Sequence, residues 1–573
     1  MADGYRGAEE LTRHQPGSAW VRHVPPVCWL RSYQSGWLAH DVVAGITLAA
    51  YAIPVSLAYS ALAGLPPQVG IYGYLLGGLG YALLGSSRQL AIGPTSAISL
   101  MIAGTVGAMA GGDAQRYAQI ASLAAFTVAL FCLLAWWLRL SVLVRLISDS
   151  ILVGFKAGAG LTIAMTQLPS LFGVAGGGHN FFERAVLLVG QLGQIHYLVV
   201  AVGTVAILLL VVGERIFPAK PVGLAVVALA ILVASLFGLP ALGVAVTGEI
   251  PAGLSTMGLP TLRLRDVEGI FPLAAGCLLL AYVESVSAAR AFADKHDYAI
   301  DTRQEFLGIG AANLAAALGH GYPVAGGLSQ SAVNDKARAR TPLALVFASA
   351  TLALCLLFFT GLLENLPKAV LAAIVLTAVY GLIDFPAMAR MWRISRMDFY
   401  AAAIALAAVL LLGILQGILL AALASILMLL MRASQPHVAF LGRIPGTDSY
   451  SDLARHPENE PLRNAIVCRP EASLLYVNAD SVLEAVSSRL NAENASDTRL
   501  VVVDLSASPY IDLAACGMLH KLHGELARQG VVLRIVGAHG RVRDLLRADG
   551  LDAKVGGLAR LITLDDVLTS VGK

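Results

Sequence analysis

The sequence is poor in charge. Asp, Glu, Lys and Arg make up 13% of its 573 residues, about half of the roughly 25% that soluble domains carry. A deficit of this size over so long a chain excludes an ordinary soluble protein and indicates a polytopic membrane protein. The deficit is uneven, since residues 436–573 hold 32 of the 77 charged residues. We therefore predict a cytoplasmic N-terminal segment (1–36), a transmembrane domain (37–433) and a soluble domain (434–573).

Several motifs are also missing. The cysteines (28, 132, 277, 355, 468 and 516) form no CxxC pair, and no His, Cys, Asp and Glu cluster has metal-ligand spacing. There is no basic stripe with interleaved aromatic residues, and the Gly-rich stretch "GFKAGAG" (154–160) lacks the GK[ST] ending of a phosphate-binding loop. These absences give no support to a cofactor, a nucleic-acid partner or an enzymatic activity. The polar N-terminus has no signal-peptide apolar region, so we expect it to stay in the cytoplasm.

Apolar runs follow one another closely through the first three quarters of the chain. About fourteen membrane spans are expected, near 42–62, 68–85, 93–111, 117–138, 148–171, 197–213, 221–238, 268–292, 304–319, 326–339, 342–363, 368–383, 398–412 and 414–431. The stretch 179–196 is typical of an interfacial helix. Alternating crossings place on one side Arg88, Arg139, Arg145, Arg215, Lys220, Arg290, Lys295, Arg303, Lys336, Arg338, Arg340, Arg390, Arg393, Arg396 and Arg432.

The opposite side receives mainly Arg116, Arg184, Arg263, Arg265 and Lys368. The asymmetry follows the positive-inside rule and predicts that both termini are cytoplasmic. We expect a multi-pass protein of the cell membrane, the inner membrane if the source is bacterial.

The soluble part has an α/β pattern. Residues 474–479, 499–506 and 531–537 are typical of strands, and 517–530 and 540–550 have helical periodicity. The polar, turn-rich stretch 445–461 predicts a loop. Strands that alternate with helices favour a small sheet covered by helices.

Two spans are interrupted in the same way. Gly93 and Pro94 open the third span, and Pro323, Gly326 and Gly327 precede the tenth, the third of the second set. Matching breaks in the two halves indicate an inverted-repeat transporter and its binding site. A helix that begins inside the membrane has unpaired N–H groups and about half a positive charge at its N-terminus, which attract an anion.

Hydroxyl groups at both breaks, those of Thr95, Ser96, Ser329 and Ser331, can add hydrogen-bond donors. The alternative is that the small residues only let helices pack closely, as in the seams Gly73–Gly77 and Gly154–Gly158.

One carboxylate lies deep in an apolar span. Glu284 stands in "CLLLAYVESVSAARA", where an ionisable residue is costly and marks a functional site. It could carry a proton or accompany a cation. The alternative is a structural carboxylate paired with Arg290, although six residues of separation put the two on different helix faces. Lys156 is interpreted as a residue whose ammonium reaches the cytoplasmic interface.

Three stretches resemble the sulfate permease (SulP) family. "IPVSLAYSALAGLPPQVGIYGYLLGGLGYALLGSSRQLAIGPTSAIS" (53–99) is similar to its signature region. "ESVSAARAFADKHDYAIDTRQEFLGIGAANL" (284–314), with "YPVAGGLSQSAVNDKARARTPLA" (322–344), resembles its second signature. The C-terminal part resembles the family's STAS domain, and the resemblance covers roughly 37–569.

The resemblance implies a seven-plus-seven inverted-repeat fold. It also implies a core domain with the site between spans three and ten, a gate domain, elevator-like alternating access and a homodimer. Substrates of the family are sulfate, bicarbonate, chloride, oxalate and dicarboxylates, coupled to protons or sodium or exchanged. The substrate-binding residues implied here are Tyr51, Thr95, Ser96, Ala97, Gly327, Leu328, Ser329 and Gln330.

The sequence departs from the family at three places. Val55 follows Pro54 where relatives often have Gln, and Gln330 follows Ser329 where many have a basic residue. A donor and a cation are thus missing from the expected pocket. In the STAS part Leu513 and Ala514 replace the phosphorylatable hydroxyl that follows Asp512 in related domains. Dimerisation, trafficking or docking of a protein partner is the expected role of that domain.

The sequence thus predicts a secondary active transporter of inorganic anions, sulfate-type and proton-coupled, with Glu284 as the coupling residue. Alternatives are a bicarbonate carrier, possibly sodium-coupled, a dicarboxylate carrier, an exchanger, or a channel or voltage-responsive motor protein. A membrane-tethered signalling protein that acts through its STAS domain is a further class. Expected partners are a small anion (sulfate or bicarbonate), a proton or sodium ion, membrane lipid and a second copy of the chain.

Overall fold

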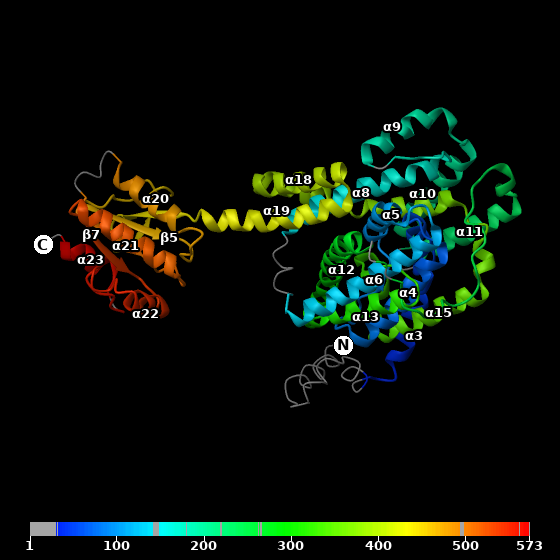
Figure 1. Cartoon of the computed structure of the whole chain (residues 1–573), viewed down its shortest axis with the longest axis horizontal. Helices are drawn as coiled ribbons and strands as arrows, with labels where there is room; N and C mark the ends of the chain where they lie inside the picture. The colour runs from blue at the N-terminus through cyan, green and yellow to red at the C-terminus, as the bar shows by residue number, and fades with distance from the viewer. Residues whose placement is uncertain are drawn as a thin grey trace. The chain divides into compact units, whose positions relative to one another are not determined.

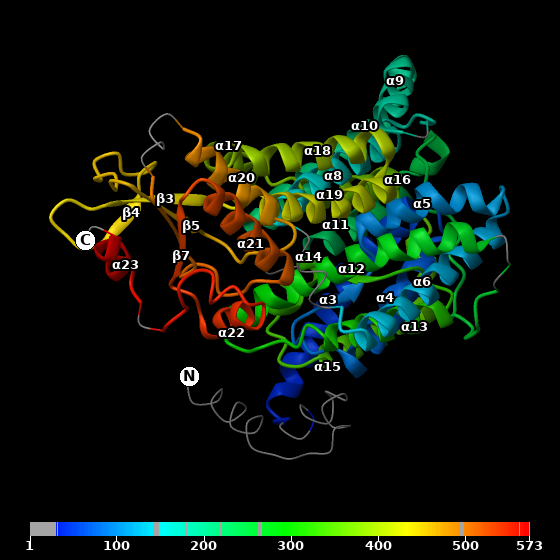
Figure 2. The same cartoon turned by 60° about the vertical axis from the view of Figure 1, so that its left-hand side comes forward.

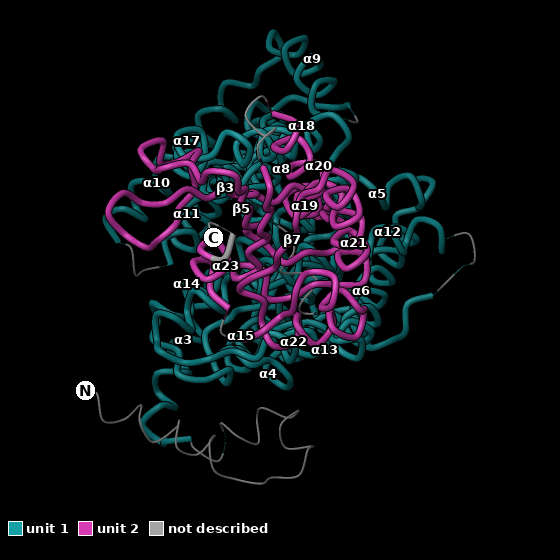
Figure 3. The backbone as a smooth tube through the Cα atoms, turned by 90° about the vertical axis from the view of Figure 1, so that its left-hand side faces the viewer, with its two compact units in different colours: residues 1–425 teal, residues 426–573 magenta. Residues whose placement is uncertain are grey.

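The computed structural model describes residue 30 and residues 33–140, 148–178, 180–217, 221–261, 263, 266–492, 498–560 and 562–571. The chain divides into two compact units, 1–425 and 426–573, which Figure 3 colours separately. Most of the predicted N-terminal segment lies outside the described residues, as do Cys28, Arg145, Lys220 and Arg265.

The first unit is helical, and fourteen of its described helices form two sets of seven when the last, which extends into the second unit, is included (Figure 1). The first set is α3 (Trp37–Leu62), α4 (Pro67–Leu84), α5 (Ser96–Ala110), α6 (Ala114–Trp137), α8 (Asp149–Phe172), α10 (Tyr197–Ile216) and α11 (Val222–Leu236). The second is α12 (Val267–Lys295), α13 (Gln304–Leu318), α14 (Leu328–Lys336), α15 (Leu343–Phe358), α16 (Lys368–Tyr380), α18 (Arg396–Leu412) and α19 (Ile414–Ser434). Each predicted span coincides with one of these helices.

Seven helical segments of the described chain are long and apolar enough to cross a membrane, among them α3, α6, α8, α10, α12 and α19. Shorter apolar helices include α5, α11 and α15. The chain is therefore a multi-pass membrane protein. The short helices α5 and α14 are the two broken spans, because the residues before each form a short strand instead of helix.

Packing repeats between the halves when each helix is exchanged for its counterpart. Helix α3 packs on α15 as α12 packs on α6, and α4 packs on α15 as α13 packs on α6. Helix α8 packs on α18 as α16 packs on α10. Figure 2 shows α12, α6, α4 and α13 side by side. These matched pairs show the predicted inverted repeat in three dimensions.

Two further helices stand at matched points, each between the fifth and sixth helix of its half. The first, α9 (Phe181–Gln191), is the predicted interfacial helix, with an asparagine cap at Asn180. The second, α17 (Phe385–Ile394), was not predicted, because its arginines suggested a loop. An aspartate cap at Asp384 and Pro at the first turn start this helix. Short 3₁₀ turns occur at Leu192–Gln194, Leu239–Leu242 and Thr360–Leu363.

Glycine seams let some helices approach closely. A Cβ atom at Gly154 would overlap the backbone of Ala402 on α18, and one at Gly80 would overlap the backbone of Ala311 on α13. Close packing of small residues therefore does occur here, as the alternative interpretation of the glycines required. The Gly73–Gly77 seam of α4 packs against the breaks themselves, since Cβ atoms there would contact Val324, Pro94 and Ile92. Close packing and the paired breaks thus occur at the same place.

The second unit contains a five-stranded mixed sheet in the order β4-β3-β5-β6-β7. Its strands are β3 (Val438–Arg443), β4 (Tyr450–Asp452), β5 (Ala465–Pro470), β6 (Leu500–Asp504) and β7 (Val532–Val536). Strand β3 is antiparallel to β4 and β5, and β5, β6 and β7 are parallel. The helices are α20 (Ala479–Leu490), α21 (Leu513–Arg528), α22 (Gly540–Ala548) and α23 (Leu564–Val571).

Two expectations for this unit were wrong. Residues 474–479 form a turn, because the Asn478 side chain accepts from the Leu475 N–H and donates to the Ser473 carbonyl. Only Leu474 makes a bridge, to Ile511. The predicted loop 445–461 contains the short strand β4. The strands β6 and β7 and the helices α21 and α22 are confirmed within a few residues.

The cysteines of this unit are buried and free. Burial raises the pKa of the Cys468 thiol to about 12 and that of the Cys516 thiol to about 11. Both therefore stay protonated and unreactive at neutral pH, in keeping with a role as small hydrophobic residues.

A buried carboxylate ties the start of α3 to the segment that joins α14 and α15. Asp41 is fully buried and accepts hydrogen bonds from the Arg340 N–H (2.7 Å), the Thr341 N–H (3.1 Å) and the Thr341 hydroxyl (2.7 Å). We expect Asp41→Ala to lower the free energy of unfolding by about 3 kcal/mol, because buried donors lose their charged acceptor. A lowered melting temperature of the detergent-solubilised protein measures the effect.

The control is Asp113→Ala. Asp113 is exposed and accepts from the Gln115 and Arg116 N–H groups as the cap of α6. Its loss should cost only about 1 kcal/mol. Equal melting temperatures for the two variants would contradict the role given to Asp41.

Candidate functional site

The two breaks meet in a two-stranded antiparallel sheet. Strand β1 (Ile92–Gly93) pairs with β2 (Ala325–Gly326), Ile92 opposite Gly326 and Gly93 opposite Ala325. Helix α5 begins three residues after β1, and α14 begins two residues after β2. The pairing therefore brings the N-termini of two short helices together, although more than 200 residues separate them in the chain.

Both helix starts leave backbone donors without helical partners. Thr95 precedes α5 in an extended conformation, and the first intrahelical bond is from the Ser99 N–H to the Thr95 carbonyl (2.9 Å). Gly327 likewise precedes α14 in an extended conformation, and the Ser331 N–H donates to the Gly327 carbonyl (3.0 Å). Neither N-terminus is capped by the side chain that precedes it. The first-turn amides, with the helix dipoles behind them, form a region that favours an anion.

Buried side chains fix the position of α14. The Asn313 amide donates to the Val324 carbonyl and accepts from the Val324 N–H, both at 3.0 Å. Ser285 on α12 accepts from the Gly326 N–H at 2.7 Å. The Ser331 hydroxyl accepts from the Ala91 N–H at 3.0 Å and donates to the Gly327 carbonyl. The helix start is thus held rigidly, which a pre-organised binding site requires.

The predicted residues differ in exposure. Thr95, Ser96, Ala97 and Gln330 are buried, Tyr51 and Gly327 are partly buried, and Leu328 and Ser329 are exposed. The Gln330 amide donates to the Ala325 carbonyl (3.2 Å), while its Oε1 and the Thr95 Oγ1 have no partner among the described residues. Unsatisfied buried polar atoms are uncommon, and here they lie at the starts of α5 and α14.

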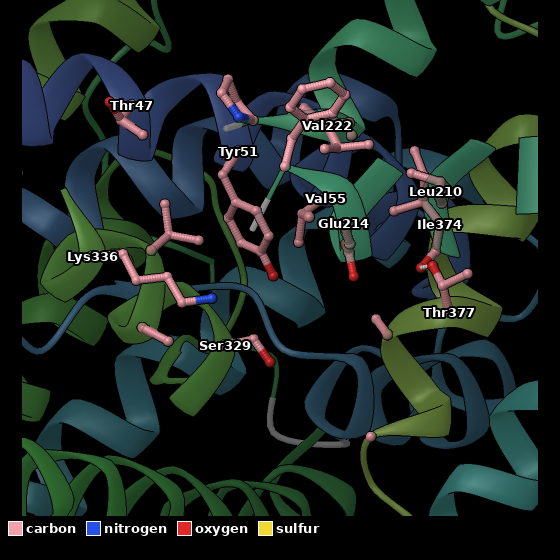
Figure 4. Close-up of a pocket in the computed structure, with 18 residues that line it drawn as sticks. Thr47, Tyr51, Val55, Leu210, Glu214, Val222, Ser329, Lys336, Ile374 and Thr377 are labelled. Atoms are coloured by element: carbon pink, nitrogen blue, oxygen red, sulfur yellow. Dashed lines mark hydrogen bonds between the residues drawn. The ribbon is translucent and has the colours of Figure 1, made fainter. Parts of the chain in front are cut away.

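A cavity of about 400 Å³ opens beside the start of α14 (Figure 4). It lies between α3 and α14 on one side and α10, α11 and α16 on the other, with the segment before α11 adding to the wall. Two predicted residues, Tyr51 and Ser329, line it. The other predicted residues are not among its lining residues, so the structure brings only this pair to the open space.

Sequence reasoning missed two charged residues of the cavity, Glu214 on α10 and Lys336 on α14. A signal for Lys336 was available, since it follows Ser329 by seven residues and so lies on the same helix face. Glu214 had no such signal, because nothing in the sequence shows that the end of α10 faces the start of α14.

Glu284 lies on α12 and is partly buried. Its Oε2 has no hydrogen-bond partner among the described residues, although the Thr95 side chain lies close to the carboxylate. The cation whose field acts on it is Lys156 on α8. Arg290, the partner considered from the sequence, is exposed. Lys156 is partly buried on α8, a helix of the other half, and its interpretation as an interfacial residue stays a prediction.

Asp512 in the second unit caps α21. Its Oδ1 accepts from the Ala515 N–H (3.0 Å), and its Oδ2 accepts from the Tyr476 N–H (2.7 Å). Leu513, where related domains carry a hydroxyl, is 72% exposed. Among the described residues of both units, no group of three or more His, Cys, Asp and Glu could hold a metal ion.

Comparison with known families gives two matches. The family described as the sulfate permease family matches residues 38–405, and the STAS domain matches residues 456–565. The chain is 35% identical to a probable sulfate transporter of Mycobacterium tuberculosis over 532 residues, 93% of this chain and 95% of that protein. It is 29% identical to probable sulfate transporter 4.2 of Arabidopsis thaliana, over 94% of this chain and 82% of that one.

Solved structures share the fold. The murine solute carrier 26 family member A9 anion transporter, in the inward-facing state, superimposes with a TM-score of 0.87 at 20% identity, over 99% of this chain and 98% of that chain. The transmembrane domain of a cyanobacterial bicarbonate transporter gives a TM-score of 0.60 at 20% identity, over 69% of this chain and 98% of that chain.

Proposed function

The chain belongs to the sulfate permease family, and from this premise we propose that it is a secondary active transporter of small inorganic anions, with sulfate as its principal substrate. The family is one of transporters and not of enzymes. The relatives named above are called sulfate transporters, which supports sulfate for this chain.

The observation that carries the proposal is the meeting of two helix N-termini next to a cavity. Their amides supply partial positive charge without adding a mobile cation, so the anion can leave as well as enter. We assign Thr95, Ser96, Ala97, Gly327, Leu328, Ser329 and Gln330 to this anion site, with Tyr51 on the facing wall. The Thr95 hydroxyl can rotate to donate to the anion, and the Gln330 Oε1, which only accepts, can hold a water that donates to the anion.

The transport step follows from where the cavity lies. Helices α3 and α14 contribute one wall and α10, α11 and α16 the other. We assign the first pair to a core domain that carries the anion and the second group to a gate domain. An elevator-like displacement of the core against the gate would then expose the site alternately to the two sides of the membrane. The cavity corresponds to the cytoplasmic-facing state, since Lys336 lines it and the positive-inside rule puts Lys336 in the cytoplasm.

Coupling is assigned to a proton carried by Glu284. An anion that crosses with only partial compensating charge needs a neutralising partner, and Glu284 is an ionisable group near the start of α5. Proton symport is the form of coupling that one carboxyl group supports most simply.

We assign residues 1–36 to a cytoplasmic segment, 37–433 to the transport domain and 434–573 to a cytoplasmic STAS domain. The protein is placed in the cell membrane, the inner membrane if bacterial, as a homodimer surrounded by lipid. The STAS domain contributes to assembly or to docking of a protein partner. A monomeric mass in lipid nanodiscs would contradict the homodimer.

Bicarbonate is the second candidate substrate, with sodium as the coupling ion. Two observations favour it. Val55 and Gln330 stand where relatives often carry a glutamine and a basic residue. The fold is also shared with the transmembrane domain of a bicarbonate transporter.

Uptake of labelled sulfate, bicarbonate, chloride and oxalate into proteoliposomes tests the proposal, with imposed pH and sodium gradients. We expect saturable sulfate uptake that an inward proton gradient accelerates. Uptake of bicarbonate alone, driven by sodium, would replace sulfate with the second candidate. Current without gradient-driven accumulation would indicate a channel.

A further inference from the structure

Helix α17 has an apolar side and a basic side. Phe385, Met388 and Trp392 recur at helical spacing, whereas Arg390 and Arg393 stand one turn apart on the other side. No residue of α17 is buried, and Phe385 is 60% and Trp392 43% exposed. Large exposed apolar side chains on a helix that also has a charged side are typical of a helix that lies in a membrane interface.

The neighbours of α17 in the chain place it at the end of two membrane spans. It begins four residues after α16 and ends one residue before α18, and both of these helices coincide with predicted spans. Helix α17 packs on α18, beside which Figure 2 shows it, and on α8. The positive-inside rule assigns this end of the spans to the cytoplasmic face. Helix α17 therefore lies where the chain meets the headgroups of the cytoplasmic leaflet.

The basic side of α17 has no acidic residue of its own helix to balance it. Asp384, which precedes the helix, caps it by accepting from the Ala387 N–H at 2.9 Å. Arg390 and Arg393 are exposed, and neither forms an ion pair or a side-chain hydrogen bond with any residue that the structure describes. Free guanidinium groups bind phosphate in a bidentate way, so the pair is suited to an external phosphate group.

A third arginine stands beside the pair. The Arg396 guanidinium lies over the Trp392 ring, 3.7 Å from its centroid. Trp392 also packs edge-on against Phe399 of α18, with the ring centroids 4.8 Å apart. These contacts hold the tryptophan at the junction of α17 and α18. Tryptophan is enriched at the level of lipid headgroups, where its ring is partly apolar and its N–H group can meet water.

The matched helix of the first half has a different charge. Helix α9 contains Glu183 and Arg184, whose charges cancel, and the Arg184 Nε donates to the Gly178 carbonyl at 3.1 Å. Alternating crossings put α9 on the face opposite to α17. The repeat thus places an amphipathic helix on each face, and of the two it is α17 that carries uncompensated positive charge. Anionic phospholipids give the cytoplasmic leaflet the complementary negative charge.

We propose that α17 binds an anionic phospholipid of the cytoplasmic leaflet, with Arg390 and Arg393 on its headgroup phosphate. A phospholipid satisfies both sides of the helix, because its acyl chains cover the apolar residues while its phosphate meets the arginines. The inference rests on the cytoplasmic orientation proposed above. Helix α16, to which α17 is joined, belongs to the wall assigned to the gate. Lipid bound at α17 thus anchors the gate in the leaflet while the core moves.

Binding of fluorescent phosphatidylglycerol to the detergent-solubilised full-length protein tests this, with fluorescent phosphatidylcholine as the lipid without net charge. We expect the wild type to bind phosphatidylglycerol at least about tenfold more tightly. The double variant Arg390→Gln with Arg393→Gln should lose about tenfold in phosphatidylglycerol binding and nothing in phosphatidylcholine binding, because each basic residue near the headgroups contributes several-fold. Arg390→Lys with Arg393→Lys keeps the charge and should stay within about threefold of the wild type.

The matched control is Arg541→Gln with Arg560→Gln, which removes the same charge from two exposed positions of the second unit. It should change phosphatidylglycerol binding by less than about twofold. All four arginines are exposed, so we expect every variant to elute at the wild-type volume.

Three results would overturn the proposal. A wild type without preference for phosphatidylglycerol has no such site. Equal losses in the two glutamine pairs would mean that net charge acts without a site on α17. A lysine pair that binds as weakly as the glutamine pair would mean that the charge is not what binds the lipid. The measurement involves no transported anion, so its failure would leave the proposed transport function standing.

Discussion

Ser329→Phe is expected to reduce anion uptake to the level of protein-free liposomes. Ser329 is exposed, lines the cavity and supplies one of the first-turn amides of α14. A phenyl ring there fills the space in front of the helix N-terminus and excludes a hydrated anion from it. Initial rates of labelled sulfate uptake into proteoliposomes give the measurement.

Two further variants distinguish the steric effect of the phenyl ring from the loss of the serine hydroxyl. Ser329→Ala removes only the hydroxyl and should weaken apparent affinity by about three- to tenfold, the worth of one hydrogen bond. Ser287→Phe is the control, since Ser287 is exposed on α12 and does not line the cavity. Wild-type uptake by Ser329→Phe, or equal loss in both phenylalanine variants, would refute the site.

Glu284→Gln is expected to abolish proton-driven accumulation of the anion while it leaves anion exchange across the membrane intact. The amide resembles the protonated carboxyl in shape and cannot titrate, so substrate should still bind and exchange across the membrane. Accumulation under an inward proton gradient should be lost. For one proton per anion, a gradient of one pH unit corresponds to about tenfold accumulation in the wild type, and to none in this variant.

The measurement compares steady-state accumulation with counterflow exchange in the same vesicles. Glu268→Gln is the control, because Glu268 is an exposed carboxylate in the first turn of the same helix. If Glu284→Gln accumulates sulfate like the wild type, Glu284 is a structural carboxylate and not the coupling residue. Loss of exchange as well would show that the residue is needed for binding.

Much of the membrane fold could be predicted because span length and apolar composition are local properties. The breaks at Gly93–Pro94 and Gly326–Gly327 were also visible locally, and their matched positions predicted that two helix ends meet. The strands β1 and β2, which pair at that place, were not predicted. Helix α17 was missed because its arginines suppressed the apolar signal. The turn at 474–479 was mistaken for a strand because Asn478 redirects the chain through its own side chain.

The residues that line the cavity were harder to predict from the sequence. Ser329 was named for its hydroxyl at the second break and Tyr51 through the resemblance, and both lie on the cavity wall. Glu214 could not be named, since its contribution depends on how α10 faces α3 and α14. The electrostatic influence of Lys156 on Glu284 likewise depends on where two helices far apart in the chain lie.

The position of a bound anion tests the central claim most directly. Selenate has the charge and shape of sulfate and scatters anomalously, so crystals grown with it locate the anion without an assumed site. We predict an anomalous peak between the two helix N-termini, within hydrogen-bonding distance of the first-turn amides that follow Thr95 and Gly327. A reproducible peak elsewhere in the membrane domain, with these amides unoccupied in protein that transports selenate, would contradict the account.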